Sequence, residues 1–468
     1  MESFFEAIKS LGGLPMGSAQ FSNLYGAAVR ILLPVLAALL LLRCAKSLLT
    51  FRKEPEIWAW LCLPDGNQLP ITHWENVIGR NKRSDIVIDL PTISRSHAVL
   101  TRYDDGSWTI SDIGSKGGIQ VNGQDTALCA LEPGDVISLN GLEMTLEPIT
   151  ENQEAYQTTL RTKAGKDFHP SVTLVLLSLF QVFMTLQLLF TAELEDMGSI
   201  ALGFGSIFAI QWLLFAFYCA IRRRGYEVET IAFFLSTLGM ALIATADPGE
   251  AGKQIAAMVL GLGLFLFLGW SLRDLERAKK VRYLAAGFGL LLLAVNLSRF
   301  ASWRHVWEVP LEGGYQQTRA MMCIASGGLL GLGGGNGWLK YVAASDTDLV
   351  FATVSEEWGL LIGVMMVLAV VCLGAFVVRA APVGRSSFYT IGACAAISIL
   401  MVQTILNVLG TVDLLPLTGV TFPFVSNGGS SMISAWGMLA FIKAADTRQN
   451  ASFAIRLPSR KKEAVQYE

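Results

Sequence analysis

Long apolar stretches separated by short polar ones fill most of the chain after residue 170. Several of them approach or exceed the roughly 20 residues that a helix needs to cross a bilayer. Residues 25–43 form an earlier stretch, which no basic segment or small-residue cleavage site frames as a signal peptide. The pattern predicts a polytopic α-helical membrane protein with this first span and eight more, at about 170–192, 198–221, 228–246, 252–271, 282–298, 350–379, 386–410 and 429–444.

Residues 57–149 have a different pattern. Short runs of alternating apolar and polar residues, such as "SHAVLTRY" and "SWTISDI", are separated by Gly, Asp and Asn turns. This is typical of an all-β sandwich. The expected domains are an N-terminal segment with an anchor helix (1–56), the sandwich (57–149), a polar linker (150–169), a membrane domain (170–445) and a basic tail (446–468).

Composition supports the membrane assignment, because only 16% of the residues are charged, against roughly a quarter in soluble domains. Basic residues follow the first span and recur at 222–224, 273–282 and 456–462. The positive-inside rule then places the sandwich and the tail in the cytoplasm, and the segments 299–349 and 411–428 outside. The seven cysteines and four histidines show no ligand spacing, so neither a disulfide framework nor a zinc site is indicated.

The sandwich carries "GR" at 79–80, "SRSH" at 94–97 and "NG" at 122–123. These residues, in this order, resemble a forkhead-associated (FHA) domain, a family that binds phosphothreonine peptides. The resemblance implies a phosphopeptide site made by Arg80, Ser94, Arg95 and Asn122. Guanidinium groups and a hydroxyl suit a phosphate, whereas His97 is expected to brace a loop.

One element departs from the FHA pattern. Gly117, Gly118 and Ile119 stand where the family usually has Asn-Gly-Thr, whose Asn contacts the peptide backbone. A domain that keeps only its fold, or that binds an unmodified partner, is therefore the alternative.

Glycines are concentrated in "SGGLLGLGGGNG", residues 326–337. Irregular backbone at membrane depth is tolerated only against protein or a water-filled cavity. The sequence therefore predicts a loop or a broken helix that lines a cavity. Close packing of helices, where glycine is also common, is the alternative.

Two outer segments carry further motifs. The first holds Tyr315-Gln316, Ser326-Gly327-Gly328, Thr347-Asp348 and Glu356 to Gly359; the second holds Pro416, Thr418-Gly419, Pro423-Phe424, Ser426 and Gly428 to Ser431. In this order they resemble the SEDS family of peptidoglycan glycosyltransferases, the RodA, FtsW and SpoVE type. The resemblance implies a SEDS-like helical bundle that polymerises lipid-linked disaccharide-pentapeptide (lipid II) outside the membrane, in cell shape, division or sporulation. Its implied partner is a class B penicillin-binding transpeptidase.

The resemblance carries the family's catalytic carboxylate onto Asp348, as the general base of an inverting transfer. The alternative for Asp348 is a helix N-cap. Outer-face cations could meet the pyrophosphate leaving group: Arg319 and Lys340, and after them Arg299 and Arg304. The other candidate substrate-binding residues are Glu357, Ser426 and Ser430. Glu356 and Glu357 could instead brace the outer loop by pairing with an arginine. A divalent cation could assist, although the sequence shows no ligand cage for one.

Four features depart from the SEDS pattern. Asp346 stands where His or Gln is common, and Asn427 replaces a Tyr. Ala343-Ala344 replaces Pro-Glu. About two central spans of the usual ten are not found. A catalytically inactive scaffold that recruits phosphorylated division proteins is therefore the second functional hypothesis, and a lipid II transporter is the third.

Overall fold

The structure, a computed structural model, describes residues 19–50, 56–150, 170–271, 314–448 and 451 with short gaps at 83, 104–105, 222 and 224, and a few isolated residues between these ranges. The predicted span at 282–298 and the candidate cations Arg299 and Arg304 lie outside the described residues.

The predicted sandwich is present and has two sheets. The first has the order β2 (Gln68–Ile71), β1 (Ala59–Cys62), β11 (Leu142–Pro148), β10 (Val136–Leu139), β7 (Ile119–Val121), β8 (Gln124–Thr126). The second has the order β4 (Ile86–Val87), β3 (Glu75–Gly79), β5 (Ala98–Arg102), β6 (Trp108–Asp112), β9 (Leu128–Leu131). Alternate residues such as Leu100, Ile110 and Ile137 are fully buried between the sheets, as the period of two in a strand requires.

Strand register separates the two ends of the sandwich. Glu75 of β3 pairs with Thr101 of β5, and Ile78 pairs with Ala98. Trp74 and Arg102 therefore lie at one end, and the loops that follow β3 and precede β5 lie at the other. Because Leu139 pairs with Ile119, the loops at 113–118 and 140–141 share the second end.

Within the described residues, seven helices are long and apolar enough to cross a membrane: α2 (Ala19–Leu49), α4 (Pro170–Thr191), α5 (Met197–Ala220), α6 (Glu227–Ala246), α7 (Ala251–Ser271), α12 (Leu360–Ala380) and α13 (Ser387–Thr411). They confirm a multi-pass membrane protein. The expected last span is α14 (Gly429–Ala444), a helix of 16 residues.

One predicted span is wrong in its form. The stretch 350–379 is two helices, α11 (Val350–Glu357) and α12, because the helix is interrupted between Glu357 and Leu360. Gly359 has a φ of +91° there, a conformation that continues no right-handed helix. The hydrophobic pattern does not indicate this interruption, because the apolar run continues past it.

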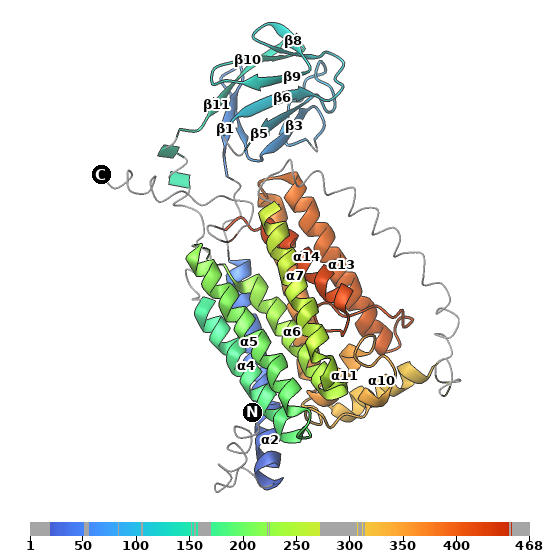
Figure 1. The fold of residues 1–468 in the computed structure, drawn as a ribbon. Coiled ribbons are helices and arrows are strands. Elements are labelled where there is room, and N and C mark those ends of the chain that lie inside the picture. Colours follow the sequence, from blue (N-terminus) through green and yellow to red (C-terminus); the bar gives the residue numbers. More distant parts are fainter. Residues whose placement is uncertain are drawn as a thin grey trace.

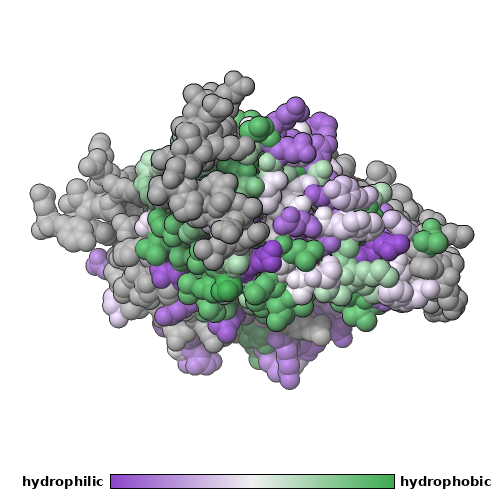
Figure 2. Space-filling view, turned by 90° about the horizontal axis from the view of Figure 1, so that it is seen from below, coloured by the Kyte–Doolittle hydropathy of each residue, from purple (hydrophilic) through white to green (hydrophobic). Residues whose placement is uncertain are grey.

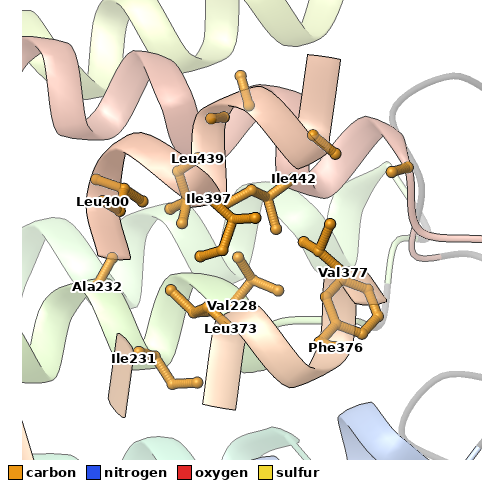
Figure 3. Packing of buried hydrophobic residues seen from close by; sticks show 14 of the residues in the cluster. Val228, Ile231, Ala232, Leu373, Phe376, Val377, Ile397, Leu400, Leu439 and Ile442 are labelled. Carbon is orange, nitrogen blue, oxygen red and sulfur yellow. The ribbon is translucent and has the colours of Figure 1, made fainter. Parts of the chain in front are cut away.

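Helix α6 is the central helix of the bundle. Almost all of its apolar window (94%) is buried inside the protein. Its residues Val228, Ile231 and Ala232 pack against side chains of three other helices, α12, α13 and α14. Figure 3 shows these partners: Leu373, Phe376 and Val377, Ile397 and Leu400, and Leu439 and Ile442.

The sandwich lies at one end of the bundle, and α10 (Tyr315–Gly327) and α11 lie at the other (Figure 1). The main-chain N–H of Trp74 donates to the carbonyl of Arg385 (2.6 Å), and the Trp74 and Tyr389 rings are in edge contact. The Arg385 guanidinium donates to both oxygens of Glu56 (2.8 and 2.9 Å). The sandwich is therefore docked on the start of α13.

A buried ionic network lies beside this contact. Arg448 bonds to Glu227 (3.2 Å) and to Asp446 (2.7 Å), and Lys443 bonds to Glu229 (3.0 Å). All five residues are at most 4% exposed. Buried charges require such partners, so the segment around 446–448 packs into the bundle.

Candidate functional site

Two segments far apart in sequence meet at the end of the bundle opposite the sandwich. Three successive carbonyl groups, those of Asp346, Thr347 and Asp348, each accept a hydrogen bond from the C-terminal part of the chain. The donors are the Asn427 N–H (2.8 Å), the Ser426 hydroxyl (2.7 Å) and the Asn407 amide (3.0 Å). The backbone that carries Asp348 is therefore fixed from outside its own loop.

Asp348 itself is half-buried and precedes α11. Its N–H donates to the carbonyl of Ala344 (2.9 Å), a residue with a φ of +63°. The N-cap of α11 is Leu349. Asp348 therefore lies one position before the N-cap and is not itself the N-cap, as the alternative interpretation had expected.

Side-chain contacts also link the two segments. The Asn427 amide donates to the Asp346 carboxylate (2.8 Å). The Ser426 hydroxyl accepts from the Phe422 N–H (2.7 Å) while it donates to Thr347. Both hydrogen-bonding roles of Ser426 are thus used inside the protein. Ser430, the other predicted substrate-binding hydroxyl, is exposed at the start of α14.

Glu356 and Glu357 are fully buried and brace the loop that precedes Asp348. Both oxygens of Glu356 accept from backbone N–H groups, those of Trp338 and Leu339 (2.9 Å each). Glu357 accepts from the N–H of Gly335 (3.2 Å). In the described part of this loop, the bracing partners are backbone N–H groups rather than an arginine.

The two candidate cations lie near this brace. The Lys340 ammonium donates to the carbonyl of Gly335 (2.7 Å), next to Glu357. The Arg319 guanidinium lies over the rings of Tyr315 (5.3 Å) and Trp338 (5.6 Å). Trp338 is 46% exposed. The end of the molecule shown in Figure 2 mixes hydrophilic and hydrophobic residues.

The glycine-rich segment forms a loop, as predicted, and its glycines permit close backbone contacts. A Cβ atom on Gly327 would lie 2.4 Å from the Ser355 carbonyl oxygen, and one on Gly331 would lie 2.3 Å from that of Glu357. One on Gly359 would lie 2.3 Å from that of Leu329. These contacts favour close packing against the α11–α12 break, the alternative interpretation, over the lining of a cavity.

The sandwich brings three cationic side chains to its far end. Arg80, Arg95 and Lys116 are exposed there. The Arg80 N–H donates to the Ser94 carbonyl (3.0 Å), and the Lys116 N–H donates to the Ser94 hydroxyl (3.0 Å). Gly79 allows this approach, since a Cβ there would lie 2.3 Å from the Arg95 carbonyl oxygen. A site with exposed cations around one hydroxyl can bind a phosphate group.

His97 braces this site, as expected. Its side chain is fully buried. Nδ1 accepts from the Ser94 N–H (3.2 Å), so Nε2 is the protonated nitrogen and donates to the Gly118 carbonyl (2.9 Å). The N–H of Ser115 bonds to Asp112 (2.9 Å) and holds the pKa of this carboxyl below its usual value.

Asn122 does not lie in the loops that carry Arg80, Arg95 and Lys116. It has a φ of +51° in the turn between β7 and β8. Its amide donates to Asp135 (2.9 Å) and accepts from the Val136 N–H (3.0 Å). The bond from Asn122 helps to hold the pKa of Asp135 below its usual value. Its role toward a peptide stays a prediction, and its observed role is to join two loops.

Comparison with known proteins assigns a family to the membrane part and to the sandwich. Residues 212–451, more than half of the chain, match the family described as cell cycle protein, the FtsW, RodA and SpoVE family. The chain belongs to this family. Residues 76–140 match the FHA domain. The FHA domain of a Chlamydia trachomatis protein is 25% identical and covers 20% of this chain and 99% of that one, with a TM-score of 0.19.

Curated relatives come from the same family. Stage V sporulation protein E of Bacillus subtilis is 36% identical over 164 residues, 33% of this chain and 44% of the relative. A probable peptidoglycan glycosyltransferase FtsW of Tolumonas auensis is 34% identical over 238 residues (48% and 61%). Peptidoglycan glycosyltransferase RodA of Mycobacterium tuberculosis is 32% identical over 227 residues (44% and 47%). The chain spans about half the length of these relatives.

In this FtsW/RodA/SpoVE-family chain, sequence reasoning missed Asn407. It is 2% exposed on α13, and its amide donates to the carbonyls of Asp348 (3.0 Å) and Val420 (2.9 Å). A polar side chain within an apolar span is costly unless it finds a partner. That cost was the signal that could have identified it.

Proposed function

We propose that this chain is a peptidoglycan glycosyltransferase that polymerises lipid II on the extracytoplasmic face of the bacterial cytoplasmic membrane. The observation that carries this proposal is the fixed backbone of Asp348 in the motif shared with the family. The curated relatives named FtsW and RodA support the reaction class.

In the proposed reaction Asp348 is the general base. Its carboxylate removes the proton of the acceptor sugar 4-hydroxyl as this oxygen attacks the anomeric carbon of the donor. The new glycosidic bond forms while the bond from that carbon to the pyrophosphate breaks. The pyrophosphate leaves with the bonding electrons, and Arg319 and Lys340 are the candidate cations that stabilise its charge.

The FHA domain adds a second proposed function, the binding of a phosphothreonine protein in the cytoplasm. Arg80, Arg95 and the Ser94 hydroxyl are the proposed phosphate ligands. The basic clusters at 222–224 and 273–282 support this orientation. A class B penicillin-binding transpeptidase is the proposed partner on the outer side.

The test is lipid II polymerisation by the purified chain in vesicles, with and without the transpeptidase. We expect glycan product from the wild type and a loss of about 100-fold or more for Asp348→Asn, in line with general-base catalysis. Asp413→Asn is the matched control, since Asp413 also lies in the outer loops. Product that survives Asp348→Asn would refute the base assignment.

The scaffold hypothesis predicts a different result. A wild type that binds a phosphothreonine protein but forms no glycan product, with the transpeptidase present, would favour the scaffold. The shorter match to the relatives is the observation behind this second candidate.

A further inference from the structure

The residues that hold Asp348 form a pattern of their own. The carbonyl groups of residues 346, 347 and 348 are held by three donors that all come from residues 407–427. Two of these donors are side chains, and the third is a backbone N–H. Because three adjacent acceptors are fixed, the Cα atom of Asp348 has little freedom to shift, and its carboxylate is carried with it.

Among these three links, the one between Asp346 and Asn427 has the most hydrogen bonds. It has two hydrogen bonds, one between the main chains and one from the Asn427 amide to the Asp346 carboxylate, both of 2.8 Å. Both residues are half-buried, so a carboxylate at 346 without a donor would be costly.

These two residues are also two of the changes from the SEDS pattern, one in each motif segment. Sequence reasoning treats Asp346 and Asn427 as separate departures, because they are 81 positions apart in the chain. The structure brings them into contact as an acceptor and its donor. One change is therefore matched to the other.

We propose that Asp346 and Asn427 are a matched positioning pair which, with Ser426 and Asn407, sets the place of the Asp348 carboxylate for the reaction. The inference rests on the proposed function of Asp348. The pair does not touch the reacting atoms; it acts through the backbone of residues 346–348. A displacement of about 1 Å in a catalytic group can cost about 100-fold in rate.

The decisive experiment exchanges the two groups. In Asn427→Asp two carboxylates face each other, so the side-chain hydrogen bond is lost and only the main-chain one can remain. In the double variant Asp346→Asn with Asn427→Asp the amide and the carboxylate trade places, and the contact can form again with the same net charge. Asn336→Asp is the control, because it adds the same charge to an exposed position of the outer loop.

Each full-length variant is reconstituted in vesicles, and the kcat and KM for lipid II are measured together with hydrogen exchange of the peptide at 344–350. We expect Asn427→Asp to lower kcat by about tenfold or more with little change in KM, and to speed exchange. The exchanged double variant should recover most of the wild-type kcat and most of the wild-type protection from exchange. Asn336→Asp should behave as the wild type. A purely structural role would lower thermal stability and active fraction without this reciprocal rescue of kcat.

The outcomes separate the two proposals. An active wild type with an equally active Asn427→Asp, or a double variant no better than the single one, overturns the positioning pair alone. A wild type that makes no glycan product, while hydrogen exchange still shows the reciprocal rescue, overturns the proposed reaction and with it any catalytic role of the pair.

Discussion

At the scale of residues, Ser94 and Asn122 show what a motif can and cannot specify. Both belong to the FHA pattern, and the pattern treats both as peptide ligands. The Ser94 hydroxyl accepts from the main-chain N–H of Lys116, and Arg80, Arg95 and Lys116 are exposed on the same group of loops. Asn122 instead uses its amide to join two loops. A motif identifies the residues, whereas the contacts show that Asn122 braces two loops; the ligand role of Ser94 stays a prediction.

Ser94→Ala tests the proposed phosphate site. We expect the full-length chain to lose about tenfold or more in affinity for a phosphothreonine peptide, the effect of one charge-assisted hydrogen bond. Fluorescence anisotropy in detergent measures this, with the unphosphorylated peptide as a second ligand. Ser96→Ala is the matched control, since Ser96 is an exposed neighbour. Equal affinity for the two peptides would contradict phosphate recognition.

At the scale of elements, the break between α11 and α12 depends on close contacts with the glycine loop. Gly331 has a φ of +80° and lies against the Glu357 carbonyl. The loop N–H groups of Leu332 and Gly333 donate to the carbonyls of Glu356 and Glu357 (2.9 and 2.8 Å). These bonds satisfy carbonyls that the broken helix leaves without helical partners.

Gly331→Ala should therefore destabilise the bundle by about 2 kcal/mol or more, because it combines a strained φ with a steric clash. The apparent Tm of the purified chain measures this. Gly263→Ala is the control, since Gly263 is exposed on α7 and an added Cβ there meets nothing within 4 Å. An unchanged Tm for Gly331→Ala would show that the loop adapts.

Most elements were predictable because their signals are local. Alternation identifies the strands of the sandwich, and apolar length identifies the seven long helices. The break after Glu357 was not predictable, since its cause is the loop at 327–333 packed from another part of the chain. For the same reason the motifs pointed to Asp348, while the link between Asp346 and Asn427 required the structure.

At the scale of the whole molecule, the sandwich and the bundle share one interface. Trp74, which is 8% exposed, joins them through Tyr389 and the Arg385 carbonyl. Arg385 also donates to the carbonyl of Thr447 (2.9 Å), beside the buried ionic network of Arg448, Glu227 and Asp446. The interface is therefore continuous with the core of the bundle.

Trp74→Ala should uncouple the two parts. We expect calorimetry to show two unfolding transitions in place of one cooperative transition, together with faster hydrogen exchange at 383–390. Trp74→Phe, which keeps an aromatic ring against Tyr389, should remain close to the wild type. Identical thermograms for the two variants would mean that the Trp74 contact does not couple the two parts.

The orientation of the sandwich affects which ligands can reach its proposed phosphate loops. Its docked end holds Trp74 and Arg102, and its proposed phosphate loops lie beyond the opposite ends of β3 and β5. Five strand residues span roughly 17 Å at about 3.3 Å each. A ligand anchored in the same membrane would need an extended tether of at least that length before its phosphothreonine arrives. The proposed site therefore favours threonines on long flexible tails over those immediately next to a membrane anchor.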